Sequence, residues 1–242
     1  MKNIRFSAKG KAGEVLLYGD IGASFWGDGI TAKAFADELK TMGAVDTLDV
    51  RINSYGGDVF DGLAIHRQLI DHGAEVTTHI DGIAASIASV IAMAGNKIIM
   101  SESGQLMIHD AWTVAIGNAE ELRAVADRVD TTSATMAELY AKRSGASADK
   151  IRDWMRAETW FNGKEAALVG LVDEVAENVA IAARAAPAWL ALAHQAGRFK
   201  DTPAPAPKLV VDNGDRPLRE AAQKKIDEMR ARMTARQSSG RG

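Results

Sequence analysis

The sequence contains no cysteine, which excludes disulfide bonds and thiolate metal ligands. Neither sign of charge dominates, because 29 lysines and arginines stand against 32 acidic residues and give a net charge of −3. This balance gives no electrostatic reason to expect nucleic acid as a partner. The five histidines show no metal-ligand spacing, so we expect neither a metal site nor a cofactor.

Long apolar runs are also missing. No window reaches the ~18 apolar residues that a membrane-spanning helix requires, and the N-terminal stretch 1–15 lacks the apolar centre of a signal peptide. We therefore expect no membrane partner and a cytoplasmic location.

The overall composition is that of a globular protein, with 47% hydrophobic and 25% charged residues among 242. One folded domain, residues 1–180, followed by a tail is the simplest organisation. Residues 181–200 are alanine-rich and predict a short helical extension, and 201–216 form a proline-rich, extended linker. Residues 217–242 are charged and poor in core-forming residues, so they are either disordered or a helix that binds a partner.

Strand and helix patterns alternate along the domain and predict an α/β fold. A strand at 14–18, a helix at 31–42 and a strand at 47–52 form a βαβ unit, whose crossover is almost always right-handed. The strands should therefore be parallel, with their carboxyl ends at one rim. The same patterns predict helices at 59–72 and 87–94 and strands at 76–80, 97–100 and 105–108.

A long helical pattern follows at 119–144, and a shorter one at 148–156. A helix of ~25 residues extends for ~38 Å, more than a small domain needs to cover its sheet. We expect the long helix to protrude and reach a neighbouring molecule. The alternative is a helix that folds back on its own domain.

One serine stands at a predicted strand-to-helix junction. Ser86 lies within Asp81–Ser89 (DGIAASIAS), between a glycine-led turn and a run of small apolar residues. The unpaired N–H groups and positive dipole end of a helix start favour a developing negative charge, which suits a nucleophile. The alternative is that Ser86 caps the helix.

Two further segments end at the same predicted rim. Arg51–Asp58 (RINSYGGD) carries a glycine pair, which lets a backbone N–H approach a substrate carbonyl. His109 ends the strand at 105–108, and it follows Ser86 in the chain. A serine, a histidine and a glycine-lined strand end are therefore expected to meet.

Taken together, INSYGGD, GIAASIAS and MIHDAW resemble the Clp-type serine peptidases, in the order and nearly at the spacing of that family. The resemblance covers about Glu14–Val175, and it is greatest to the phage-type branch, the head-maturation or prohead proteases. The chain departs from the housekeeping form of the family at two places: Tyr55 stands where that form usually has proline, and Asp110-Ala111-Trp112 follows the histidine in place of Gln-Pro. The resemblance implies a ClpP/crotonase-like superhelix of βαβ units, with 119–144 as the handle helix through which two rings meet.

The resemblance also implies an activity and its residues. The chain would be a self-compartmentalising serine endopeptidase, ATP-independent or assisted by an unfoldase. Ser86 would be the nucleophile and His109 the general base, and the backbone N–H groups of Gly57 and Ile87 would hold the oxyanion.

The acid of the triad is less clear from the sequence. Aligning backward from Gly170–Asp173 places Glu158 where the family has aspartate. Asp153 is the second choice and Asp110 the third. The alternative is that Glu158 is an ordinary surface acid.

The partners implied by the resemblance are polypeptide substrates, further copies of the chain in stacked rings, and capsid or scaffold proteins of an assembling phage. Two other classes stay open. One is a catalytically silent scaffold or capsid-associated protein on the same fold, which the glutamate at position 158 keeps in consideration. The other is a crotonase-type acyl-CoA enzyme, against which the Ser86 and His109 pair argues.

Overall fold

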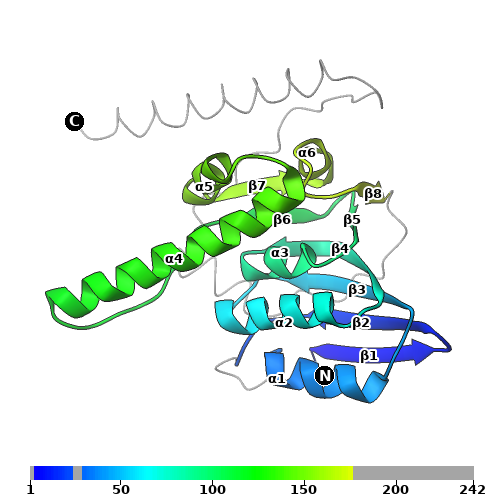
Figure 1. Cartoon of the computed structure of the whole chain (residues 1–242). Coiled ribbons are helices and arrows are strands. Elements are labelled where there is room, and N and C mark those ends of the chain that lie inside the picture. Colours follow the sequence, from blue (N-terminus) through cyan, green and yellow to red (C-terminus); the bar gives the residue numbers. More distant parts are fainter. Residues whose placement is uncertain (1–2, 24–28, 177–242) are drawn as a thin grey trace. The chain divides into compact units, whose positions relative to one another are not determined.

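The computed structural model describes residues 3–23 and 29–176, drawn in colour in Figure 1. Contacts divide the chain into Met1–Val179 and Ala180–Gly242, and all described residues belong to the first unit. The extension, linker and tail predicted at 181–200, 201–216 and 217–242 lie outside the described residues.

An eight-stranded sheet forms the centre of the described part, in the order β1-β2-β3-β4-β5-β8, with β6 pairing β4 and β7. Strands β2 to β5 are parallel, as the βαβ pattern predicts, whereas β1 and β7 are antiparallel to their neighbours. The predicted α/β class is confirmed. The strands are β1 (Ile4–Lys9), β2 (Ala12–Tyr18), β3 (Thr47–Ser54), β4 (Glu75–Ala85), β5 (Lys97–Ser101), β6 (Gln105–Ile108), β7 (Thr159–Asn162) and β8 (Glu174–Ala176).

Helices α1, α2 and α3 cover one face of this sheet (Figure 1). Capping side chains define the starts of α1 and α2, since Thr31 accepts from Ala34 N and Asp58 from Phe60 N. The predicted boundaries hold within two residues here. The helices are α1 (Ala32–Met42), α2 (Val59–Asp71), α3 (Ile87–Ala92), α4 (Ala119–Ser144), α5 (Ala148–Arg156) and α6 (Gly163–Leu168).

Strand β4 is longer than the predicted 76–80 because it continues through a bulge. Ile80 pairs with Ile52, but Ala84 pairs with Ser54, so β4 carries extra residues between the two pairs. The first half of β4 pairs with β5 and the second half with β6. The bulge therefore carries the end of β4, and Ser86 after it, away from β5 and toward β6.

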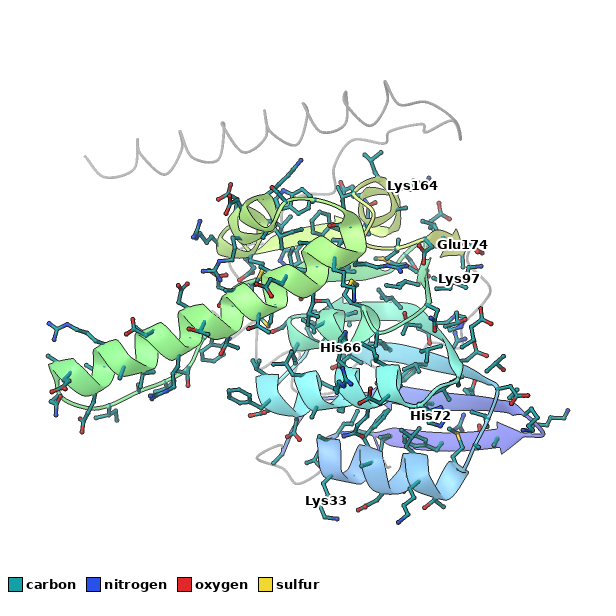
Figure 2. The ribbon with its side chains drawn as sticks, in the orientation of Figure 1. Lys33, His66, His72, Lys97, Lys164 and Glu174 are labelled. Carbon is teal, nitrogen blue, oxygen red and sulfur yellow. The ribbon has the colours of Figure 1, made fainter. Side chains whose placement is uncertain are left out.

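The sequence patterns missed the elements after α5. Strand β7 returns antiparallel to β6, and β8 adds to the edge of β5. Lys97 Nζ lies 2.5 Å from Glu174 Oε2 across this edge, and both side chains are labelled in Figure 2. Strands β7 and β8 are both short, which gives their side chains little room to alternate in a recognisable pattern.

Helix α4 has the predicted bounds and extends well beyond the sheet (Figure 1). Asn118 and Glu121 form a capping box at its start, and Gly145 ends it in the left-handed conformation. Its buried residues all lie in the C-terminal half, from Ser133 to Tyr140. The N-terminal half of α4 is therefore available for contact with another molecule. Within 3–23 and 29–176, no helix is long and apolar enough to cross a membrane.

Candidate active site

Ser86 lies between β4 and α3 in a conformation that residues other than glycine rarely adopt. Its φ is 55° and its ψ is −130°, and its side chain makes no capping hydrogen bond to α3. Instead, Ser86 Oγ lies 2.7 Å from His109 Nε2. A serine held in a strained turn against an imidazole is the arrangement of a nucleophile and its base. The helix-cap alternative has no hydrogen bond to support it.

His109 follows β6 directly and is largely shielded from water. Burial lowers the pKa of His109 below its ordinary value, and the negative charges of Glu158 and Asp110 raise it in part. The imidazole is therefore neutral at neutral pH, with Nε2 able to accept the proton of Ser86 Oγ. This is the protonation state that a general base requires.

The three candidate acids lie in different surroundings. Glu158 is exposed, and it makes no hydrogen bond to His109 among the described residues, although its charge acts on that ring. Trp160 Nε1–H donates to Glu158 Oε1 over 3.4 Å. Asp110 accepts from Arg152 Nη1 at 3.0 Å. The exposed Asp153 pairs with Arg156 at 3.4 Å and does not contribute to the pKa shift of His109.

The glycine pair meets the turn of Ser86. A side chain at Gly56 would bring its Cβ within 2.8 Å of Ser86 Cβ, and a Cβ at Gly57 would lie 2.0 Å from Ile21 O. Both glycines also have positive φ. Among the described residues, the N–H groups of Gly57 and Ile87 make no hydrogen bond, so both remain able to donate to a substrate.

An apolar row lies beside Ser86 on the sheet. Ala85 pairs with Met107, and Met107 pairs with Trp160 across β4, β6 and β7. Ile83 joins this cluster, and Tyr55 packs against it. Such a surface suits an apolar side chain of a bound peptide.

Sequence patterns did not reveal one polar group of the site. Ser89 and Tyr140 form a buried hydroxyl pair beneath the Ser86 turn, at 2.7 Å from each other. The sequence gives no direct signal for this pair, because Ser89 lies in the apolar run after Ser86 and Tyr140 lies 51 residues later, among the apolar positions of the long helix. Among residues 3–23 and 29–176, no group of acidic or histidine side chains is placed to hold a metal ion.

Comparison with known proteins identifies the family to which this chain belongs. The model of the family described as Clp protease matches residues 29–179. The chain belongs to the Clp protease family. This match covers Ser86, His109, Glu158, Gly57 and Ile87, so the Ser–His contact and the glycine turn both lie within the family domain.

Two relatives within the Clp protease family have the same printed name, "ATP-dependent Clp protease proteolytic subunit". The protein from Bacteroides fragilis is 31% identical over 153 residues, which cover 61% of this chain and 74% of the relative. The protein from Ligilactobacillus salivarius is 30% identical over 152 residues, covering 61% and 77%. The likeness thus spans most of each relative and leaves a large part of this chain unmatched.

Proposed function

We propose that this Clp-family chain is a serine endopeptidase in which Ser86 attacks the peptide carbonyl. The contact of 2.7 Å between Ser86 Oγ and His109 Nε2 carries this proposal. Its support also includes the positive φ of Ser86, which presents the side chain on a sharp turn. The free N–H groups of Gly57 and Ile87 next to that turn are the third observation in support, because they can donate to an oxyanion.

The reaction follows from the positions of these groups. His109 Nε2 takes the hydroxyl proton as Oγ forms a bond to the carbonyl carbon, and the carbonyl oxygen becomes an oxyanion. The N–H groups of Gly57 and Ile87 donate to that oxyanion. His109 then returns the proton to the leaving amine as the C–N bond breaks, and water hydrolyses the acyl-enzyme by the same steps in reverse order.

Glu158 is our choice for the group that stabilises the imidazolium. It is the carboxylate with the largest electrostatic effect on His109, ahead of Asp110. Asp110 is already engaged by Arg152, and Asp153 faces Arg156. In the proposed mechanism the exposed Glu158 side chain rotates away from Trp160 and accepts a hydrogen bond from His109 Nδ1.

We further propose that the protein works as a homo-oligomer of stacked rings, in which the protruding half of α4 contacts another copy. Exposed apolar side chains concentrate on this half and on the segment before it. They are Trp112, Val114, Ile116 and Leu122, with 59%, 81%, 98% and 42% of their surface exposed. Apolar surface of this extent is typical of a protein interface.

For the substrate, we propose capsid or scaffold proteins of an assembling phage. This part rests on the resemblance of the three motifs to the prohead protease branch and on the residues beyond the family domain, which could recruit such a partner. The two relatives are named as subunits of an ATP-dependent protease. Cleavage of a folded substrate with and without an added unfoldase and ATP separates the assisted from the independent mode.

A fluorophosphonate probe and a short fluorogenic peptide test the chemistry. We expect the probe to label the wild type and not Ser86→Ala, and Ser86→Ala and His109→Ala each to abolish cleavage. The double variant should be no worse than either single variant, because the two residues act as one unit. Ser7→Ala, an exposed serine on β1, is the control and should be labelled normally.

The other outcomes assign the protein to another class. A fully active Ser86→Ala, or losses that multiply in the double variant, would contradict the proposed mechanism. Absence of both labelling and cleavage in the wild type would favour the silent scaffold, an alternative supported by the missing bond between Glu158 and His109. The Ser86 and His109 contact argues against a crotonase-type enzyme.

A further inference from the structure

The strained backbone of Ser86 is held by several hydrogen bonds. Its N–H donates to Met107 O over 3.0 Å, and its carbonyl accepts from Ser89 N over 3.0 Å. Ser89 Oγ donates to the same carbonyl over 2.6 Å. A left-handed φ in a residue other than glycine costs of order 1–3 kcal/mol and persists only where the surroundings enforce it. These contacts are the ones that enforce it here.

Ser89 does not act alone, because Tyr140 supports it from α4. Tyr140 OH lies 2.7 Å from Ser89 Oγ, where α4 passes α3, and both side chains have 0% of their surface exposed. Burial raises the pKa of Tyr140, so its phenol keeps its proton. Tyr140 O–H can therefore donate to Ser89 Oγ, and Ser89 O–H is left to donate to the carbonyl of Ser86.

This chain of hydroxyls controls the direction of one peptide plane. The peptide bond between Ser86 and Ile87 is planar and trans, so its C=O and N–H point in opposite directions. The Ser86 carbonyl points inward, to Ser89 and Tyr140. The N–H of Ile87 must then point away from the buried hydroxyls, and it has no partner among the described residues.

We propose that Tyr140 and Ser89 are positioning residues that aim the Ile87 N–H at the oxyanion and fix the Ser86 turn. The inference rests on the proposed serine peptidase mechanism, and neither residue touches the substrate. Ser89 Oγ also lies 3.0 Å from Met107 O, the acceptor for Ser86 N. The Ser89 hydroxyl therefore lies between the turn that carries the nucleophile, to which it donates, and the strand that leads to His109.

The proposal predicts a kinetic effect that a purely structural role of Ser89 and Tyr140 would not produce. A donor to the oxyanion acts in the transition state, so its misdirection lowers kcat and leaves KM nearly unchanged. Complete loss of such a donor costs about 100- to 1,000-fold in kcat, and a donor that is present but misdirected should cost less, about tenfold.

The test compares Tyr140→Phe, Ser89→Ala and the double variant in the full chain. We expect kcat for a fluorogenic peptide to fall about tenfold in each, with KM within about twofold. The double variant should resemble the singles because the hydroxyls form one chain. The affinity for a peptide boronic acid, whose tetrahedral adduct with Ser86 resembles the transition state, should fall by the same factor as kcat/KM.

Thr78→Val is the matched control. Thr78 is also fully buried and donates its hydroxyl to Ala92 O at the far end of α3, over 2.9 Å. This variant loses a buried hydroxyl bond of the same kind, and it should lower the temperature of unfolding without lowering kcat.

Two kinds of result overturn the inference. One is wild-type kcat in Tyr140→Phe and Ser89→Ala; the other is a loss that Thr78→Val reproduces at equal destabilisation. Tyr140→Phe keeps the aromatic ring in its cavity, so it provides the test even if Ser89→Ala fails to fold. A wild type that is neither labelled nor active overturns the proposed function and this inference together, whereas an active wild type with unaffected variants overturns this inference alone.

Discussion

Glu158 combines an unusual backbone with an exposed carboxylate. Its φ is 49°, in the left-handed region, directly before β7. Glutamate has one more methylene than aspartate, so its carboxylate can approach His109 from a backbone placed slightly differently. In this structure the carboxylate lies toward Trp160 and acts on His109 through space.

This arrangement predicts an effect of Glu158→Gln on both rate and pH dependence. Removal of the negative charge lowers the pKa of His109 further, because Glu158 now opposes the effect of burial. The acid limb of kcat/KM should therefore move to lower pH, while the plateau falls by about tenfold or more because the imidazolium loses its counter-charge. The measurement is a pH profile of peptide cleavage.

Two further variants make this prediction specific. Glu158→Asp should keep part of the activity, and Asp153→Asn should have a mild effect, because Asp153 is paired with Arg156 and does not act on His109. If Asp153→Asn is the inactivating change, the acid has been assigned five residues too far along the chain.

At the scale of elements, three side chains hold the β4 bulge on the sheet face opposite to α1 and α2. Arg51 Nε donates to Asp81 Oδ2 over 2.9 Å, and Tyr18 OH donates to the same carboxylate. Asn53 Oδ1 accepts from Ile83 N over 3.2 Å. These contacts link β2, β3 and β4 and account for a strand that continues through Gly82.

The contrast between α4 and β4 shows which features were predictable. Helix α4 has its apolar stripe, a cap at Asn118 and Gly145 at its end, all of which are local signals, and its bounds were predicted correctly. Strand β4 was cut short at Ile80, because Gly82 is typical of a turn and the contacts that keep it in a strand come from β2 and β3.

The candidate site likewise combines features that local motifs predict with features that depend on contacts between distant elements. Ser86, His109 and the glycine pair were found from motifs, and the structure brings them together. The partnership of Ser89 and Tyr140 was not found, because it joins α3 to α4 and neither residue lies in a motif. The strand β1 was also missed, although Ile4 and Phe6 alternate with polar residues, because the alternation is short and the pairing of β1 depends on the tight turn after Lys9.

Helix α2 carries a buried histidine that should make stability depend on pH. Burial, with the positive charges of Lys142 and Arg67, lowers the pKa of His66 from 6.5 to about 4. Figure 2 labels His66 on this helix. Between these two pKa values the unfolded chain binds a proton that the folded chain does not, so stability falls as the pH falls from about 6.5 to about 4.

Across this pH range, protonation of His66 in the unfolded chain should lower the free energy of unfolding by roughly 3 kcal/mol. His66→Phe should remove that part of the pH dependence, measured as the free energy of unfolding in urea at several pH values. His79→Gln, on the opposite sheet face beside Asp49, controls for the loss of one histidine. An unchanged slope in His66→Phe would show that His66 is not the group responsible.

At the scale of the whole molecule, the segment before α4 must run almost straight along that helix. Ala111 N donates to Ser133 Oγ over 2.9 Å, which fixes the start of the segment on the buried half of α4. The helix from Asn118 to Ser133 is about 22 Å long, and the chain from Ala111 to Asn118 spans at most about 25 Å. The segment and the protruding half of α4 therefore form one arm.

The side chains of this arm predict how copies of the protein associate. Trp112, Val114 and Ile116 alternate along the extended segment, so they point to the same side of it, and all three are exposed. A monomer would leave this apolar row in water. We expect a second arm to cover it and join two rings.

Val114→Asp and Ile116→Asp should therefore lower the assembled mass, measured by light scattering at micromolar concentration, without unfolding the domain. Both side chains are exposed within one copy, so a charge there costs little unless the row is buried by another copy.

A chain ending at Lys200 is the control for this experiment. It lacks the predicted linker and charged tail, and it should keep both assembly and short-peptide cleavage. A monomeric wild type, or full assembly of the aspartate variants, would show that the arm does not join two copies. Loss of assembly on truncation would mean that residues beyond Lys200 belong with the peptidase domain.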